Sequence, residues 1–134
     1  MGRRLILDTA ALIALARGVP LPLRDDDELA IAAITVAEFA RGIHTAAPAK
    51  ADERRRFLDE LLASKTVTVL PYTTETAYEH AHLLHDTART GQPRGAHDLI
   101  IAAHARETGR MVFSADCRAR FDGLPGVRLC TDDA

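Results

Sequence analysis

Short apolar runs alternate with longer amphipathic stretches along the whole chain. Apolar runs predict buried strands at residues 5–7, 29–34, 67–70 and 111–113, with a short last strand at residues 127–129. Helical patterns follow them, at residues 9–17, 36–47, 50–64, 73–89 and 96–106. Strands that alternate with helices predict an α/β fold of three layers, in which helices cover both faces of a central, mainly parallel sheet of four to five strands.

An acid stands at the end of the first apolar run. Asp8 follows Leu5–Leu7 and is followed at once by the helical stretch Thr9–Arg17. Strand-to-helix junctions of this kind form the edge at which open α/β sheets bind their ligands. Aspartate is also a favoured helix N-cap, so Asp8 taken alone has a purely structural explanation.

Two further acids lie at similar junctions, and each also has a structural explanation. Glu38 follows the second apolar run, and its spacing from Thr35 fits a capping box with Thr35 as the N-cap. Asp98 falls in the first turn of the apolar helix Ala96–Arg106, where an acid interacts favourably with the helix dipole.

The fourth acid, Asp116, comes directly after the fourth apolar run and Ser114, with Asp122 as an alternative a few residues on. If the fourth strand lies beside the first, the winding of the chain reverses between them and the acids share one crevice. Clustered carboxylates repel one another unless a cation lies between them. Oxygen ligands suit Mg²⁺ or Mn²⁺, and such a site favours phosphodiester hydrolysis by a metal-activated water.

Composition limits the function classes without changing this picture. A formal net charge of −2 argues against binding of nucleic acid through bulk positive charge, but it allows a nuclease with local basic residues. Cys117 and Cys130 form no CxxC pattern, which is typical of reduced thiols in a cytoplasmic protein. Asp8 interrupts any export signal, and no apolar run approaches the ~18 residues that span a membrane.

Three other polar segments have two interpretations each. The acidic run Asp25–Glu28 is predicted to be a solvated loop rather than a metal site, because adjacent acids point in different directions. Glu53–Arg56 lies on the helix Lys50–Ser64 and is either a solvated face or an RNA-phosphate patch. His82 and His85 could share a helix face, but no third metal ligand has a compatible spacing.

Four sequence blocks, taken in order, resemble the PIN domain and in particular the VapC toxins of bacterial type II toxin–antitoxin pairs. The resemblance covers essentially the whole chain and implies a single PIN domain over residues 1–134. The blocks that carry it are Ile6–Thr9, Ile34–Glu38, His97–Ala103 and Ser114–Asp116, the last followed by Phe121 and Leu124–Val127.

The resemblance implies a Mg²⁺- or Mn²⁺-dependent endoribonuclease that acts on tRNA, ribosomal RNA or messenger RNA. It also implies a homodimer and a tight complex with a cognate VapB antitoxin. The acids that would be both catalytic and metal-binding are Asp8, Glu38, Asp98 and Asp116, with Thr9 and Ser114 as supporting hydroxyls. Of these acids, Asp8 and Asp98 are the expected direct metal ligands, whereas Glu38 and Asp116 would bind through water or orient the nucleophile.

Two alternatives belong to other classes. A receiver-like signalling domain would need an acceptor Asp after the third strand and a Lys after the last one, but Pro71–Tyr72 and Cys130–Thr131 stand there. A catalytically silent binding module with the PIN fold is the other, and the presence of acids at all four positions argues against it.

Overall fold

A sheet of four parallel strands forms the centre of the computed structural model, which describes residues 2–115 and 121–130. The strands are β1 (Arg4–Leu7), β2 (Glu28–Ala32), β3 (Val67–Leu70) and β4 (Met111–Phe113), in the spatial order β3-β2-β1-β4. Leu5 of β1 lies opposite Leu29 on one side and Met111 on the other. The fourth strand therefore lies beside the first, which is the arrangement that the shared crevice requires, and the winding of the chain reverses between them.

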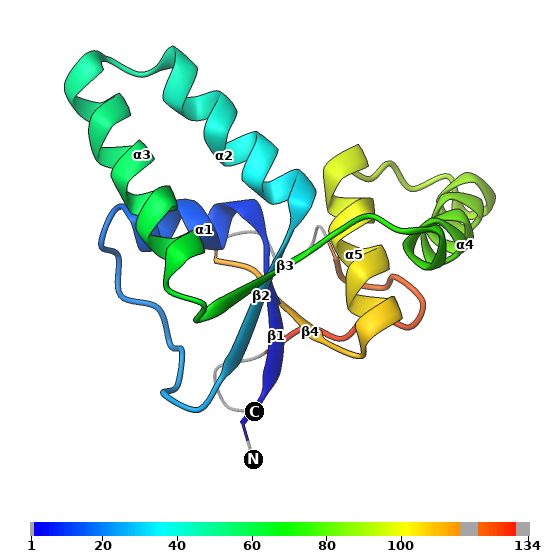
Figure 1. Ribbon diagram of the computed structural model, residues 1–134. Coiled ribbons are helices and arrows are strands. Elements are labelled where there is room, and N and C mark those ends of the chain that lie inside the picture. The colour runs from blue at the N-terminus through cyan, green and yellow to red at the C-terminus, as the bar shows by residue number, and fades with distance from the viewer. Residues whose placement is uncertain (1, 116–120, 131–134) are drawn as a thin grey trace.

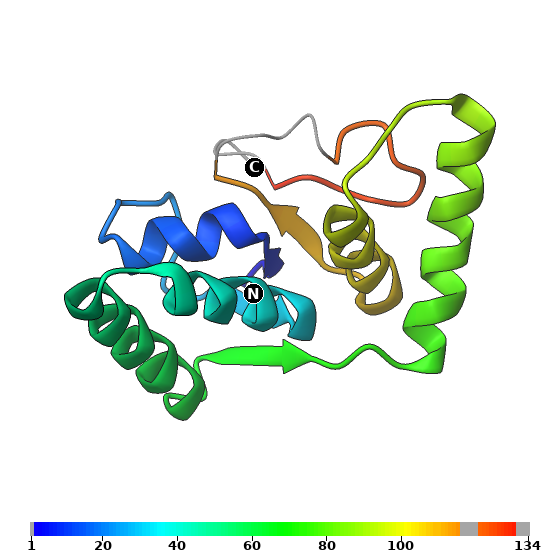
Figure 2. The ribbon, with the colours of Figure 1, turned by 90° about the horizontal axis from the view of Figure 1, so that it is seen from above.

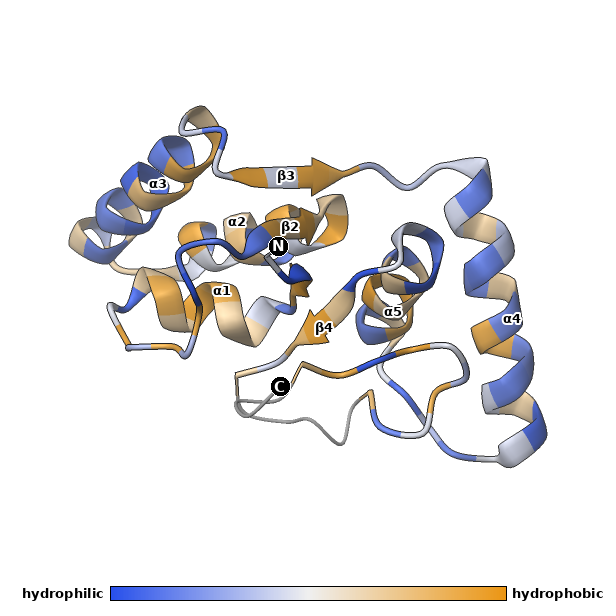
Figure 3. Ribbon diagram, turned by 90° about the horizontal axis from the view of Figure 1, so that it is seen from below, coloured by the Kyte–Doolittle hydropathy of each residue, from blue (hydrophilic) through white to orange (hydrophobic). Residues whose placement is uncertain are grey.

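Helices cover both faces of this sheet, which confirms the predicted three layers (Figures 1 and 2). One face carries α1 (Thr9–Ala16), α2 (Ala33–Thr45) and α3 (Pro48–Ala63), and the other carries α4 (Thr74–Thr90) and α5 (Ala96–Thr108). Figure 3 shows β3 and β4 as largely hydrophobic, whereas the outer helices α3 and α4 are largely hydrophilic.

Alternating side chains of β1 supply both halves of the core. Leu5 and Leu7 pack in the cluster that includes Phe39 of α2, and Ile6 packs in the cluster that includes Leu99 of α5. All three strand residues are fully buried, because a central parallel strand has helices on both of its faces.

The prediction of a short last strand at residues 127–129 is wrong, because these residues form no regular strand. Leu129 forms only an isolated parallel bridge with Val112. The Val112 N–H donates to the Arg128 carbonyl at 2.8 Å, and the Cys130 N–H donates to the Val112 carbonyl at 2.9 Å. Gly126, with a φ of +74°, lies in the turn three residues before this bridge.

The predicted capping box at Thr35 is also wrong. Strand β2 ends at Ala32, which is the N-cap of α2 and makes no side-chain capping bond, so Thr35 is already inside the helix. Starting the helix at Ala33 places Thr35, Phe39 and Ile43 on one buried stripe with a four-residue spacing. Burial of that stripe outweighs the local capping signal. Glu38 therefore has no capping role at the start of α2.

Two other local predictions need correction. Pro48 does not close the second helix but is the first residue of α3, a position where its fixed φ is favourable.

The acidic run Asp25–Glu28 is not fully exposed to solvent, in contrast to the prediction. Asp27 has a fully buried side chain and accepts hydrogen bonds from Nε and Nη2 of Arg3 at 2.8 and 2.7 Å. This charged fork lowers the pKa of Asp27, and it ties the segment before β2 to the start of β1.

The ends of the two helices on the second face follow their sequence signals. Thr73 caps α4 and exchanges hydrogen bonds with Thr76, and Gly91 ends the helix in the left-handed conformation. Gly109, with a φ of +69°, ends α5 as predicted. In residues 2–115 and 121–130, no helix combines the length and apolar character needed to cross a bilayer.

Candidate active site

Of the candidate acids that the structure describes, Asp8 is the most buried, with 1% of its surface exposed. It lies directly after β1 and caps α1, since its Oδ1 accepts the backbone N–H of Ala11 at 2.8 Å. Its Oδ2 accepts the hydroxyl of Ser114 at 2.6 Å. The backbone N–H of Asp8 continues the β1–β4 ladder by donating to the Phe113 carbonyl at 3.0 Å. Asp8 is therefore a helix cap and also a carboxylate fixed in the crevice between these strands.

Glu38 approaches the same edge of the sheet from α2. Its Oε1 accepts the hydroxyl of Thr9 at 2.6 Å, and its Oε2 lies 2.8 Å from Nδ1 of His97. The glutamate side chain is 28% exposed and the histidine side chain 49% exposed, so the pair faces solvent while its carboxylate is held at both oxygens. Thr9 adjoins Asp8 in the sequence, and this contact therefore ties Glu38 to the first acid.

Asp98 lies in the first turn of α5 and is partly buried, as predicted. The residue before this helix, Gly95, leaves room for its carboxylate. A β-carbon at Gly95 would lie only 2.9 Å from Oδ2 of Asp98. Position 95 thus accommodates the acid because it has no side chain, although its φ of −63° is open to other residues.

The structure brings most of the predicted residues to one edge of the sheet. Hydrogen bonds and sequence neighbours connect Asp8 to Glu38 through Thr9, and Glu38 to Asp98 through His97. Ser114, a predicted supporting hydroxyl, contacts Asp8 directly. Asp116 lies outside the described residues.

Sequence reasoning did not single out His97. The signal that could have found it is its position one residue before Asp98 at the start of α5, where side chains point toward the crevice between strands. Its 2.8 Å contact holds one oxygen of the Glu38 carboxylate, and metal-binding carboxylates commonly have outer partners that orient them in this way.

The donor chemistry of this edge fits a hard divalent cation. Ser114 and the Ala11 N–H fix the orientation of the Asp8 carboxylate, and Mg²⁺ is commonly held by one or two carboxylates plus waters. A cage of three or more His, Cys, Asp or Glu side chains is not found in the part of the chain that the structure describes.

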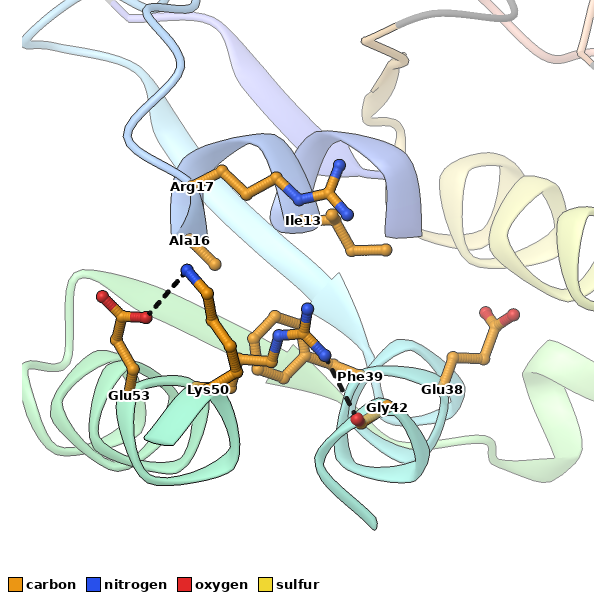
Figure 4. Close-up of a pocket in the computed structure, with 9 residues that line it drawn as sticks. Ile13, Ala16, Arg17, Glu38, Phe39, Gly42, Lys50 and Glu53 are labelled. Atoms are coloured by element: carbon orange, nitrogen blue, oxygen red, sulfur yellow. Dashed lines mark hydrogen bonds and ion pairs between the residues drawn. The ribbon is translucent and has the colours of Figure 1, made fainter. Parts of the chain in front are cut away.

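A cleft of about 420 Å³ opens beside Glu38, between α1, α2 and α3 (Figure 4). Figure 4 shows Glu38 at one end of this cleft, and Lys50 and Glu53 lie at the other. The lining residues are Ile13, Ala16, Arg17, Glu38, Phe39, Gly42, Lys50, Glu53 and Arg54.

A sheet with the order β3-β2-β1-β4 and acids at the β1–β4 crevice is the arrangement expected of a PIN domain. The family model of the PIN domain matches residues 5–124, which include most of the candidate site. The chain belongs to the PIN domain family.

Within that family, the chain is VapC-like. It is 30% identical over 131 residues to the tRNA(fMet)-specific endonuclease VapC of Salmonella typhimurium, with 94% of this chain and 96% of that protein covered. The fold is similar to that in DNA-bound VapBC from Salmonella typhimurium, with a TM-score of 0.82 at 25% identity and 97% and 98% of the two chains covered. It is also similar to VapBC-5 from Mycobacterium tuberculosis, with a TM-score of 0.71 at 28% identity and coverage of 94% and 96%.

Proposed function

We propose that this protein is a Mg²⁺- or Mn²⁺-dependent endoribonuclease and the toxin of a VapBC-type pair. The observation that carries the proposal is the Asp8 carboxylate, which is buried at the β1–β4 crevice and oriented by Ser114 and the start of α1. Membership of the PIN family removes the receiver-like alternative. The catalytically silent alternative is tested by the cleavage experiments below.

Asp8 and Asp98 would hold the divalent ion, and Glu38 and Asp116 would bind it through water or orient the attacking water. The bound ion supplies a water of lowered pKa and neutralises charge on the phosphate. The protein contributes rigidity. Ser114 and the Ala11 N–H hold the Asp8 carboxylate in one orientation, and Thr9 with His97 does the same for Glu38.

The names of the similar proteins suggest which substrate and which partners to propose. The curated relatives are named tRNA(fMet)-specific endonucleases, so a tRNA is the first substrate to test, followed by ribosomal and messenger RNA. The similar solved structures are VapBC complexes, and a VapB-type antitoxin is accordingly the proposed inhibitor, bound to a homodimer of this chain. The single domain of residues 1–134 would act in the cytoplasm, where these RNAs are found.

Metal dependence is the direct test of the reaction class. The purified protein should cleave RNA in Mg²⁺ or Mn²⁺, and cleavage should stop in excess EDTA and return when the metal is restored. Undiminished cleavage in EDTA would contradict the metal mechanism, and no cleavage of any of the three RNA classes would favour the silent module.

A growth assay tests the toxin role separately. Expression of this chain alone should arrest growth, and co-expression of the small protein encoded beside it should restore growth. An Asp8→Asn variant should not arrest growth, although it should still bind the same neighbour. Arrest by the Asp8→Asn variant equal to that of the natural chain would contradict the proposal.

A further inference from the structure

Three basic side chains, two from α3 and one from the end of α1, line the cleft beside Glu38. Arg17 is the residue that ends α1, whereas Lys50 and Arg54 lie one turn apart on α3. Figure 4 shows the long side chain of Arg17 lying over Ile13 on the upper wall of the cleft, opposite the wall that holds Lys50. The protein as a whole has a formal net charge of −2, so this gathering of cations is a local feature.

The two arginines have donors available for a ligand. Arg17 is exposed, and its side chain makes no hydrogen bond or ion pair within residues 2–115 and 121–130. Arg54 is half-buried, and one of its guanidinium nitrogens donates to the Gly42 carbonyl at 3.2 Å. A guanidinium has five N–H donors in a planar fork, so Arg54 is oriented by this contact and keeps most of its donors.

The third cation is more loosely held. Lys50 Nζ lies 3.5 Å from Oε2 of Glu53, and the two side chains are 68% and 69% exposed. An exposed pair of this kind is worth at most about 1 kcal/mol, so an anion can take the place of Glu53 at little cost. Glu53 is the opposing charge at this end of the cleft.

The position of the cleft determines which anion it suits. Glu38 forms one end of it, and Glu38 is a member of the acidic set that faces the reacting phosphate in the proposed function. A chain of phosphodiesters whose scissile group lies at the acids must continue past Glu38, and this cleft is a path lined with phosphate-binding side chains. An acidic segment of the proposed antitoxin also has compatible charge, and measurements of RNA binding beside antitoxin binding distinguish the two occupants.

We propose that Arg17, Arg54 and Lys50 form a phosphodiester-binding subsite that holds the single-stranded RNA backbone next to the scissile bond. The inference rests on the proposed function. Arg17 and Arg54 bind phosphate oxygens through paired N–H groups, and Lys50 exchanges Glu53 for a phosphate. Of the segment Glu53–Arg56, which the sequence left as either a solvated face or an RNA-phosphate patch, only Arg54 belongs to the proposed subsite. Lys50, one turn earlier on the same helix, joins it.

The test is the binding of a single-stranded RNA to full-length protein that carries Asp8→Asn, so that the RNA stays intact. Adding Arg17→Gln or Arg54→Gln should weaken binding about tenfold each, the size expected for a charge-assisted contact. Each should also reduce the slope of log affinity against log salt by about 0.7. The matched controls are Arg55→Gln and Arg56→Gln, exposed arginines of the same helix outside the cleft, which should change binding less than twofold.

Kinetics in the otherwise natural protein separate this role from catalysis. Arg17→Gln and Arg54→Gln should raise KM and leave kcat within about twofold, because the contacts are equal in ground and transition states. An Arg54→Lys variant keeps the charge and the reach to Gly42, and it should recover part of the affinity if folding is intact. Thermal unfolding of each variant shows whether the fold is retained.

Unchanged RNA affinity in both Arg17→Gln and Arg54→Gln would overturn the subsite, as would an equal loss in the Arg55→Gln control. Variants that bind the antitoxin less tightly but bind RNA normally would show a protein-docking cleft and would also overturn it. If the natural protein cleaves no RNA yet Arg17→Gln and Arg54→Gln weaken RNA binding, the proposed function fails and the subsite stands.

Discussion

Nδ1 of His97 lies 2.8 Å from Oε2 of Glu38, and this contact joins the first turn of α5 to α2 across the active-site edge of the sheet. Thr9 holds the other oxygen of the same carboxylate. Glu38 is thus fixed between the residue that follows Asp8 and the residue that precedes Asp98. The three candidate acids that the structure describes are therefore linked through Thr9 and His97, and a change at one of these positions is expected to affect the others.

His97 is a positioning residue in this framework, and its removal should reduce activity without unfolding the protein. His97→Ala should lower kcat about 10- to 100-fold, the usual effect of removing a group that orients a metal-binding carboxylate. His97→Gln can still donate to Glu38 and should recover part of that loss. His85→Ala, an exposed histidine of α4, is the control and should be neutral. Equal activity of His97→Ala and the natural protein would contradict this role.

Gly95→Ala tests the position of Asp98 without changing any charge. The added β-carbon would lie 2.9 Å from Oδ2 of Asp98, so the carboxylate must move, while the φ of −63° accepts alanine. Cleavage should fall, and the Mg²⁺ concentration for half-maximal activity should rise. Thermal unfolding should show a loss of no more than about 1 kcal/mol, the cost of alanine at an N-cap. Unaltered metal dependence would show that Asp98 does not hold the ion.

The buried ion pair between Arg3 and Asp27 should matter for stability and not for cleavage. Asp27→Ala leaves the guanidinium without its partner in a largely buried position, which costs roughly 3–5 kcal/mol. Because the folded-state pKa of Asp27 is lowered, the pair stabilises the protein above the ordinary pKa of 3.8, and this contribution is lost as the pH falls below it. Urea unfolding at neutral and acid pH measures both effects. Asp26→Ala, an exposed neighbour, should have little effect.

Mild acid should destabilise the packing of α4 on α5 through His104. This histidine is 1% exposed, neither ring nitrogen has a hydrogen-bond partner in the described part of the chain, and burial lowers its pKa from 6.5. The folded state therefore holds it neutral, and stability should fall as the pH drops below 6.5, where the unfolded chain takes up a proton. Glu107, at 3.8 Å from Nδ1, opposes this shift only in part.

Unfolding by urea between pH 5 and 7.5 measures the effect of His104. A His104→Gln variant should lose part of the pH dependence, and the remainder is assigned to His80, whose pKa burial also lowers. His80 accepts or donates a hydrogen bond at Nδ1 with the hydroxyl of Tyr72, whose ring also packs edge-on against His104. Identical pH profiles for His104→Gln and the natural protein would contradict the assignment.

The parts of the fold that depend on burial along a whole element could be predicted from the sequence. The order of strands and helices, and the meeting of Asp8 with Ser114 across β1 and β4, follow from apolar runs and the winding rule for parallel sheets. Glu38 lies at the edge of the sheet where the sequence predicts it, although the capping box that gave it a local role does not form.

The misjudged positions are those where a distant partner outweighs a local signal. Thr35 has the spacing of a cap, but the core stripe that it shares with Phe39 draws it into the helix. Asp27 stands in an acidic run, yet its partner Arg3 lies far away in sequence and buries it. The position of His97 before Asp98 indicates that it lies near the site, but its contact with Glu38 depends on α2 and α5 lying side by side, which the local sequence does not specify.

The most direct test of the account is the rate of RNA cleavage in Mg²⁺ by Asp8→Asn, measured beside Asp59→Asn. Asparagine is as good an N-cap as aspartate, so Asp8→Asn keeps α1 capped and removes only the charge. Asp59 is an exposed acid of α3 and serves as the control. We expect cleavage by Asp8→Asn to fall at least about 1,000-fold with an unchanged fold, comparable to losing a metal-activated water, and cleavage by Asp59→Asn to be unchanged. Cleavage by a folded Asp8→Asn at the natural rate would contradict the account.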